Sequence, residues 1–494
     1  MSHNAVIFPV LVPLVAGILM IFLQRSRMWQ RWVSMTAATV LVIISVSLVK
    51  TVHTDGILSL NMGGWPAPFG ITLVADMLSA LLVLASSIVC LTCLIYAFGA
   101  IGEKHERHYL YPFLMFLVCG VHGSFLTGDA FNLFVFFEVM LISSYVLLSL
   151  GGQRVQLRES LKYVVINMVA STLFVVAIAY LYSIAGTLNM AHLSERVATA
   201  GQDGLLTTVS LLFFVVFATK AALFLFVWLP GSYSAAPAPI AAIFAALLTK
   251  VGIYAILRFF TLIFPHQPQV THTVMIWLGA ATMVLGALGA VSHWGIRRIL
   301  AYNVIVSVGF IVFAIGMAGA DSLAGALYYL LHDMIAKALL FILGGTIISI
   351  AGTDRLRDIA GLIRYRPLLG WLFFLTVLSI AGIPPLSGFV GKVMILEAGV
   401  HHGQYVVAAV GLLSSLLVLY SLMKVFIQSF WGETFLTESE AFFTGKGFHA
   451  PALVLAFLTV AMGLGADRVL PYIDAAVNVM TNPELYIRAV LKLE

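Results

Sequence analysis

The sequence predicts an all-α polytopic membrane protein with about fourteen transmembrane helices. Of its 494 residues, 61% are hydrophobic and only 10% are charged, whereas a soluble domain is about half apolar and about a quarter charged. The apolar residues form long continuous runs, which favours helices over the alternating strands of a membrane barrel. The same composition excludes disordered, collagen-like and disulfide-rich secreted proteins. We therefore expect one integral membrane domain over residues 1–494.

Each expected span is an apolar run long enough to cross a bilayer. A hydrocarbon core of about 30 Å needs roughly 20 apolar residues in a helix. By this measure the predicted spans are 4–23, 31–50, 72–99, 108–127, 129–150, 160–184, 205–229, 237–263, 271–291, 297–319, 323–351, 368–399, 405–430 and 450–472.

The basic residues between spans predict the orientation. Sixteen follow odd-numbered spans: Arg25, Arg27, Arg31, Lys104, Arg107, Arg154, Arg158, Lys162, Arg297, Arg298, Arg355, Arg357, Arg364, Arg366, Lys424 and Lys446. Five lie on the opposite side: Lys50, Arg196, Arg468, Arg488 and Lys492. Since loops rich in arginine and lysine stay in the cytoplasm, both termini are predicted to lie outside.

The other five basic residues fall inside predicted spans: Lys220, Lys250, Arg258, Lys337 and Lys392. A charge at the bilayer centre costs from about 2.5 to over 10 kcal/mol, and such residues usually mark ion or proton pathways. Glu138 is an isolated acid in the fifth span, and with Lys220 it forms a candidate ion pair. Such a pair either handles protons or bridges two helices structurally.

Lys250 and Arg258 share the eighth span. Lys250 is about a dozen residues from either end, so its side chain is too deep to reach an interface easily. A lysine removed from water can act as a reversible proton carrier. Arg258 does not deprotonate in proteins, so it is interpreted as a structural or field-setting charge.

The eleventh and twelfth spans carry the remaining candidates. Asp333 precedes Lys337 by four residues, on the same helix face, so the two are expected to neutralise each other. His332 lies about 100° around that helix, and is either a proton relay or a hydrogen-bonded core residue. Lys392 follows a segment rich in proline and glycine, residues 384–391, and such interruptions at mid-membrane are typical of transporter sites.

The other polar residues near spans have weaker interpretations. Glu397 and His401 are expected to line an exit or to meet water. Capping or turn roles are predicted for Asp76, His122, Asp129 and Asn132. Buried thiols are expected at Cys90, Cys93 and Cys119, because no other cysteine or clustered histidine supports a metal site.

Four motifs give a resemblance to a known family: LTGDAFNLFVFFEVMLI at 126–142, WLPGSY at 228–233, LLTKVGIYA at 247–255 and PLSGFVGK at 385–392. They resemble the antiporter-like family shared by Mrp-type Na⁺/H⁺ antiporters, membrane-bound hydrogenases and respiratory complex I. The resemblance runs at least from the third to the thirteenth span. It implies two inverted five-helix repeats, 108–263 and 271–430, with broken helices in spans 7 and 12.

The resemblance also implies residue roles. Glu138 and Lys220 match the family's acid–lysine pair, Lys250 the central bridging lysine, and Lys392 the terminal group of a hydrophilic axis. His332 matches approximately the histidine of the second repeat, whereas Asp333 stands where relatives often carry another histidine.

The function implied is a proton-translocating subunit of a multisubunit cation/proton antiporter in a bacterial cell membrane. Protons would move along Glu138, Lys220, Lys250, the His332/Lys337 region and Lys392. The expected partners are other membrane subunits, H⁺, Na⁺ and the lipid bilayer, with no nucleic acid. No haem, Walker or Rossmann motif is found, so no cofactor is expected, and the chain is interpreted as a secondary transporter subunit and not an enzyme. Two alternatives stay open: a pumping subunit of a redox-driven complex and a passive assembly scaffold.

Overall fold

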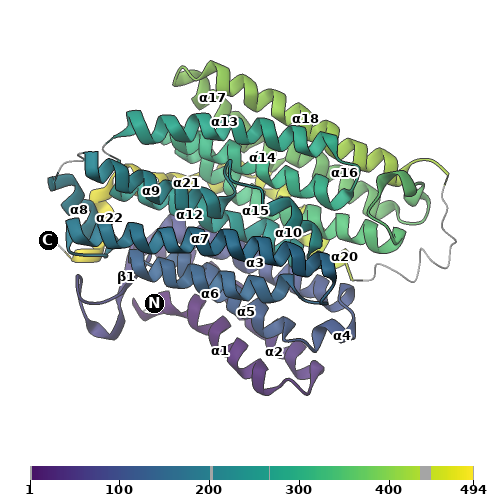
Figure 1. Ribbon diagram of the computed structural model, residues 1–494, viewed down its shortest axis with the longest axis horizontal. Helices are drawn as coiled ribbons and strands as arrows, with labels where there is room; N and C mark the ends of the chain where they lie inside the picture. The colour runs from purple at the N-terminus through teal and green to yellow at the C-terminus, as the bar shows by residue number, and fades with distance from the viewer. Residues whose placement is uncertain (1–2, 201–203, 266, 434–446, 493–494) are drawn as a thin grey trace.

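A computed structural model of the chain describes residues 3–200, 204–265, 267–433 and 447–492. Most helices run roughly along one direction and form a bundle (Figure 1). Among the described residues, eleven helices are long and apolar enough to cross a membrane, or twelve if one bent pair counts as a single span. The predicted all-helical, polytopic membrane-type fold is thus confirmed.

The N-terminal helices pack around α3 and α5. The first elements are η1 (His3–Ile7), α1 (Phe8–Phe22), α2 (Arg27–Asp55), β1 (Leu58–Asn61), η2 (Met62–Gly64), β2 (Thr72–Ala75), α3 (Met77–Ala100), α4 (Glu103–Glu106) and α5 (Leu110–Leu126). Residues 72–75, expected inside the third span, instead pair with β1 as an antiparallel strand. The helix begins only after Asp76, whose carboxylate accepts a hydrogen bond from the backbone of Ser79 and so caps the first turn of α3.

The first half of the central bundle contains an interrupted helix. Its elements are α6 (Ala130–Leu148), α7 (Arg154–Ala185), α8 (Met190–Ala200), α9 (Gly204–Ala221), α10 (Leu229–Ala235), α11 (Ala238–Ile243), η3 (Phe244–Leu248), α12 (Thr249–Arg258) and η4 (Phe259–Ile263). Between α9 and α10, Ala222 and Phe224 have φ of 61° and 57°, which stops the α-helix. The Trp228 indole donates to the Thr219 carbonyl at 3.1 Å, and Thr282 accepts from the Phe224 backbone at 2.8 Å. These contacts satisfy polar groups that the break would leave without partners.

The second half contains a matching interruption. Its elements are α13 (Pro268–Ser292), α14 (Ile296–Gly316), α15 (Ala320–Ala351), η5 (Leu356–Asp358), η6 (Leu362–Arg364), α16 (Pro367–Ala381), α17 (Ser387–His401) and α18 (Tyr405–Phe430). Helix α16 stops at Gly382, which has φ +88°, and Pro384 and Pro385 precede the start of α17. A residue with a side chain rarely adopts this φ, so Gly382 suits the break.

The C-terminal segment differs from the predicted fourteenth span. Helix α20 (His449–Leu464) is followed by α21 (Ala466–Thr481) at an angle of 82°, and then by α22 (Pro483–Leu491). The apolar run 450–472 is therefore not one straight helix, because the chain bends at Gly465. Helix α22 contacts α8 and β1, at the end of the bundle where both chain termini lie (Figure 1). Hydropathy did not predict the hairpin, α8 or α22: α8 and α22 are short and lie outside the long apolar runs, and the second strand of the hairpin was included in the third run.

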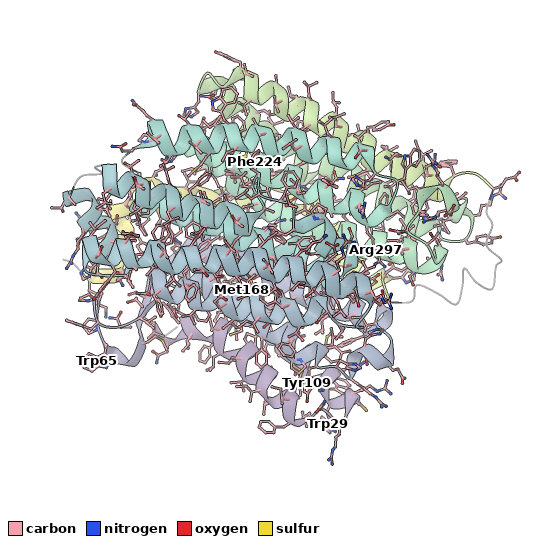
Figure 2. The ribbon with its side chains drawn as sticks, viewed as in Figure 1. Trp29, Trp65, Tyr109, Met168, Phe224 and Arg297 are labelled. Carbon is pink, nitrogen blue, oxygen red and sulfur yellow. The ribbon has the colours of Figure 1, made fainter. Side chains whose placement is uncertain are left out.

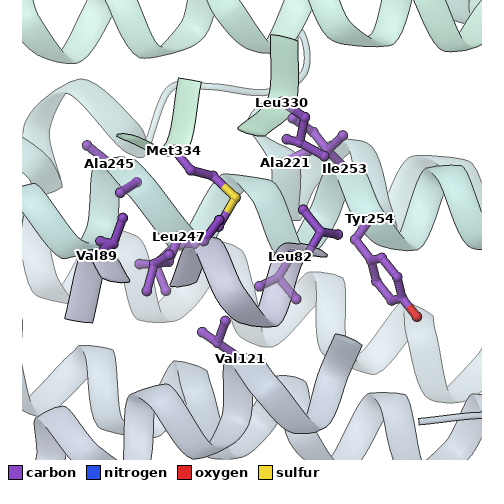
Figure 3. Packing of buried hydrophobic residues seen from close by; sticks show 14 of the residues in the cluster. Leu82, Val89, Val121, Ala221, Ala245, Leu247, Ile253, Tyr254, Leu330 and Met334 are labelled. Atoms are coloured by element: carbon purple, nitrogen blue, oxygen red, sulfur yellow. The ribbon is translucent and has the colours of Figure 1, made fainter. Parts of the chain in front are cut away.

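The helical segment 238–263 and helices α14 and α15 are the most buried, with 94% of the most apolar window of α14 inside the bundle. All of the most apolar window of 238–263 is buried, as is 89% of that of α15, whereas the share for α7 is 39%. Figure 3 shows side chains of α3, η3–α12 and α15, among them Leu82, Leu247 and Met334, packed together. A charged side chain on α12 or α15 is therefore far from water.

Aromatic and apolar side chains mark the outer surface. Figure 2 labels Trp29, in the first turn of α2, and Tyr109, whose hydroxyl donates to Gln24 in the turn between α1 and α2. Amphipathic aromatic rings favour the membrane–water interface. Met168, 60% exposed on α7, is one of many exposed apolar residues along the bundle, as expected for a surface in contact with lipid or other apolar helices.

Candidate functional site: a row of buried charged side chains

The six candidate residues lie on five helices that cross the bundle. Five of them are at most 6% exposed: Lys220, Lys250, His332, Lys337 and Lys392. The sixth, Glu138, has a side chain that is 30% exposed. These residues belong to α6, α9, α12, α15 and α17, and consecutive members of the row are joined by helix contacts or by the side-chain contacts described below.

The first cluster contains Glu138, Lys220 and a serine. Lys220 Nζ lies 4.0 Å from Glu138 Oε1, as expected for the predicted pair. Ser171 of α7 bridges them, because its hydroxyl donates to Glu138 and accepts from Lys220 Nζ at 3.0 Å. Lys220 Nζ also lies 5.0 Å from the centre of the Phe137 ring, a distance at which an aromatic face attracts a cation.

Ser171 is a site residue that the sequence reasoning missed. A signal was present, because Tyr163, Asn167 and Ser171 recur every four residues along α7 and share one helix face. All three are buried, which marks a polar stripe facing the bundle interior. An isolated serine in an apolar helix is easily taken for a neutral spacer.

Close helix packing positions Lys220. Helix α9 ends one residue after Lys220, beside Gly252 of α12. A Cβ atom at Gly252 would lie 2.6 Å from the backbone nitrogen of Ala221, closer than real Cβ contacts allow. The glycine therefore lets α12, which carries Lys250, approach the end of α9.

The central cluster contains one more lysine than the predicted pair. The contact expected between Asp333 and Lys337 is present, with 3.6 Å between Oδ1 and Nζ. The shortest contact of Asp333, however, is with Lys250, at 2.7 Å between Oδ2 and Nζ. The i,i+4 pattern indicated the contact within α15 but carried no information on the lysine of α12. One carboxylate thus lies between two fully buried lysines.

Backbone carbonyls hold both lysines of this cluster. Lys250 donates to the carbonyl of Ala245 at 2.7 Å, in the π-helical turn η3. Lys337 donates to the carbonyl of Asn303 in α14 at 2.9 Å. Each ammonium therefore has a neutral acceptor besides Asp333, so either contact with the carboxylate can lengthen without leaving an ammonium entirely unpaired.

The third cluster surrounds the break between α16 and α17. His332 Nδ1 and the Ser387 hydroxyl are 2.8 Å apart, which joins α15 to the start of α17. Lys392 donates to the freed carbonyl of Ala381 at 3.0 Å and to Ser415 at 2.9 Å. Among the described residues, no ion pair joins Lys392 to a carboxylate.

Glycines make this third cluster possible. A Cβ atom at Gly382 would lie 2.8 Å from Cδ of Lys392, and one at Gly388 would lie 2.9 Å from Nε2 of His332. The broken helix thus brings a free carbonyl, a hydroxyl and two basic side chains together at depth in the bundle.

Arg258 has the structural environment expected of it. Its guanidinium lies 2.7 Å from Asp76 Oδ2 and 5.0 Å from the centre of the Tyr486 ring of α22. Asp76 caps α3, as predicted, and in addition forms this buried ion pair, which the sequence did not indicate. The contact joins α12, α3 and α22 at the end of the bundle where the termini lie.

The remaining polar candidates lie apart from the row. Asp129 caps α6 by accepting from the Asn132 backbone at 2.8 Å, as predicted. The turn role expected for His122 is wrong, because this residue is buried within α5. Its Nδ1 donates to the Pro9 carbonyl at 2.9 Å, and its Nε2 lies 2.8 Å from the Ser86 hydroxyl, so it joins three helical segments.

Near the surface, Glu397 is exposed and His401 lies 3.8 Å from Asp321, itself partly exposed. Cys90, Cys93 and Cys119 are buried free thiols. Among the described residues, no group of three or more histidine, cysteine or acidic side chains is arranged to hold a metal ion.

The chain is similar over its full length to known membrane proteins. A family model described as "NADH:quinone oxidoreductase/Mrp antiporter, TM" matches residues 127–465. The chain is 49% identical to the D subunit of the Na⁺/H⁺ antiporter of Bacillus subtilis over 99% of this chain and 100% of that protein. It is 47% identical to the D subunit of the Na⁺/H⁺ antiporter of Alkalihalophilus pseudofirmus, with the same coverage.

Two solved structures are also similar. One chain of the Mrp complex from Dietzia sp. DQ12-45-1b superposes with a TM-score of 0.91 at 31% identity, covering 99% of this chain and 100% of that one. A chain of the membrane-bound sulfane sulfur reductase, an archaeal respiratory membrane complex, gives 0.90 at 25% identity with the same coverage. The chain therefore belongs to the NADH:quinone oxidoreductase/Mrp antiporter family of membrane subunits.

Proposed function

We propose that this member of the family is the proton-translocating subunit of a multisubunit Na⁺/H⁺ antiporter in a bacterial plasma membrane. The observation that carries the proposal is the row of buried lysines, one in each broken-helix region and two around Asp333. Buried ionisable groups at membrane depth are costly and usually mark ion pathways. The names of the two relatives from Bacillus subtilis and Alkalihalophilus pseudofirmus support the antiporter as the assembly, with other membrane subunits as partners.

Asp333 is the central switch in the proposed mechanism. A protonated Lys250 pairs with this carboxylate. When Asp333 moves toward Lys337, Lys250 loses its counter-charge in a low-dielectric environment and releases its proton. The distances of 2.7 and 3.6 Å to the two lysines describe one arrangement of such a shared carboxylate.

The two ends of the row exchange protons in the same proposal. At one end, Ser171 links Glu138 and Lys220, so a proton passes between acid and lysine through one hydroxyl. At the other end, His332 and Ser387 lie between the central cluster and the break that holds Lys392. The chain thus acts as a secondary transporter subunit, with Glu138, Lys220, Lys250, His332, Lys337 and Lys392 as the proton path.

The same proposal includes fourteen spans and two inverted repeats, 108–263 and 271–430. The two repeats are supported by the similar architecture of the two halves. Each half contains one interrupted helix and one deeply buried central helix. The interrupted helices carry Lys220 and Lys392, and the central helices carry Lys250 and Lys337. Both termini are proposed to be outside, on the evidence of the basic loops. Lys446 lies outside the described residues, and the side chain of Lys104 is likewise not described.

A redox-driven pump is the second candidate, because the family is shared with NADH:quinone oxidoreductase and the chain is similar to a respiratory complex. The 49% and 47% identities to antiporter subunits favour the antiporter. Genes for iron–sulfur or flavin subunits beside this gene would favour the pump.

The test uses inside-out vesicles from cells that lack other antiporters and express the full operon. Respiration sets up a pH gradient, and its collapse on addition of Na⁺ is followed for the wild type, Glu138→Gln and Lys220→Ala. We expect Na⁺-dependent collapse in the wild type and its loss in both variants, with the complex still assembled. Glu484→Gln, which changes an exposed acid of α22, is the matched control and should transport normally.

Each outcome separates the candidates. No Na⁺ response in a well-assembled wild type would favour the redox-driven pump. Normal exchange in both variants would favour the passive scaffold, because neither residue would then carry a proton.

A further inference from the structure

An apolar groove runs along the side of the bundle, away from the row of charged residues. It has a volume of about 340 Å³ and lies between α2, α3, α15, α20 and α21. Most of its lining is aliphatic, including Leu84, Leu458 and Met462. Val46, also in the lining, is 39% exposed, so the groove opens to the side of the bundle. Helices α20 and α21, drawn in yellow, lie behind the teal helices in Figure 1.

Two basic residues belong to the lining of this otherwise apolar groove. Lys50 lies five residues before the end of α2, and Arg468 lies in the first turn of α21, just after the 82° bend. Both side chains are exposed, and within the described part of the chain neither forms an ion pair. The nearest acids in sequence, Asp55 and Asp467, do not line the groove.

The position of these residues matches the boundary between lipid tails and headgroups. Five residues of helix correspond to about 7 Å, which places Lys50 close to the end of a spanning helix. Tyr472, which also lines the groove, lies one turn after Arg468 on the same face of α21 and has a hydroxyl that can donate a hydrogen bond. The groove therefore combines an aliphatic channel with two cations and a hydroxyl donor.

We propose that this groove binds one anionic phospholipid, with an acyl chain along α3 and α20 and the phosphate between Lys50 and Arg468. Charge complementarity selects this occupant, because a neutral apolar helix of a partner would leave both cations unpaired, whereas a phosphate accepts from both. The back wall of the groove includes Leu331 and Ile335, which flank His332 and Asp333 in α15. The bound lipid thus packs against the helix that carries the central carboxylate.

Photolabelling of the assembled complex tests this proposal. The complex is placed in phosphatidylcholine nanodiscs that contain a trace of phosphatidylglycerol or of phosphatidylcholine with a photoreactive acyl chain, and labelled peptides are identified by mass spectrometry. We expect the phosphatidylglycerol probe to label peptides of α3 and α20 much more strongly than the phosphatidylcholine probe. One basic side chain near an anionic headgroup strengthens binding of the lipid about fivefold. Lys50→Gln and Arg468→Gln should therefore each reduce labelling by about that factor.

Three further arms keep the test decisive. Met462→Trp fills the groove while leaving both cations in place, and should remove labelling of α20. Lys492→Gln changes an exposed cation outside the groove lining and should have no effect. Inorganic phosphate should not compete, since it lacks the acyl chain.

Several results would overturn the proposal. Equal labelling by the two probes, or unchanged labelling in a well-assembled Lys50→Gln/Arg468→Gln variant, would show that the headgroup is not recognised. Labelling of the full-length chain alone but not of the assembled complex would show that a partner protein covers the groove. These readouts are independent of ion transport, so they stand whether or not the chain carries protons.

Discussion

The two interrupted helices hold their lysines in different ways. At the first break, Lys220 lies beside Glu138 and is joined to it by Ser171. At the second, Lys392 is held by a carbonyl and a hydroxyl, and its ammonium lies 5.6 Å from the centre of the Phe310 ring. The two breaks also differ in backbone, since Ala222 and Phe224 have positive φ at the first and Gly382 at the second, and only the first provides a carboxylate. A protonated Lys392 is less well compensated than a protonated Lys220, so the two ends of the row are expected to differ in how readily they hold a proton.

The largest effect is expected from a change in the central cluster, which lies between the two breaks. Asp333→Asn removes the only carboxylate in contact with Lys250 and Lys337 among the described residues. Breaking a buried ion pair by removing one partner costs about 3–5 kcal/mol. We expect a strong fall in the amount of assembled complex, measured by native gel electrophoresis, and complete loss of Na⁺-dependent proton movement. Asp321→Asn, at a partly exposed acid at the start of the same helix, is the control. Normal assembly and transport in Asp333→Asn would contradict the role of the shared carboxylate.

The next prediction compares the two breaks directly, with Lys220→Met and Lys392→Met. Methionine retains much of the side-chain volume but carries no charge. Lys220→Met leaves Glu138 without its cation and should lower the melting temperature of the complex. Lys392→Met removes a buried cation that has no carboxylate partner, so the melting temperature should stay the same or rise. Both variants should lose transport, and equal destabilisation of the two would mean that the carboxylate makes no difference between the breaks.

The sequence predicted the features that follow from composition, and it missed features that depend on how the helices are arranged in space. Continuous apolar runs predicted a polytopic helical fold, and isolated charges identified the residues of the row. The contact of Asp333 with Lys337 was predicted but its shorter contact with Lys250 was not, because sequence spacing reports contacts along one helix but not those between α12 and α15. Ser171 was missed for another reason, because a serine in an apolar helix was taken for a neutral spacer although it belongs to the polar stripe of α7. The bend at Gly465 was missed because hydropathy measures apolar length and carries no signal for direction.

A smaller effect is expected from replacing Ser171, which bridges Glu138 and Lys220 at the first break. Ser171→Ala removes a hydroxyl that contacts both Glu138 and Lys220. Because the two charges are still about 4 Å apart, the pair should persist, although two charge-assisted hydrogen bonds are lost, each worth roughly 1.5–3 kcal/mol. We expect the rate of Na⁺-dependent proton movement to fall at least tenfold, with near-normal assembly.

Two variants test whether the hydroxyl itself matters. Ser171→Thr keeps the hydroxyl and should restore most of the rate. Ser183→Ala, at an exposed serine of the same helix, should have no effect. If Ser171→Ala transports as fast as the wild type, the proton does not pass through this hydroxyl.

The smallest effect is expected from an ion pair outside the membrane-spanning helices. Arg27 lies 2.8 Å from Glu103 of α4, and this contact lowers the pKa of the Glu103 carboxyl below its ordinary value. A lowered pKa means that the stability from this pair is present above the ordinary pKa of glutamate and is lost as the pH falls through the lowered value. Glu103→Gln should therefore lower the melting temperature slightly at neutral pH and not at all under more acidic conditions. Since the carboxylate is exposed, added salt should also remove the difference. A large, salt-independent loss would mean that charges at the surface of this protein are as strongly coupled as Asp333 and its two lysines.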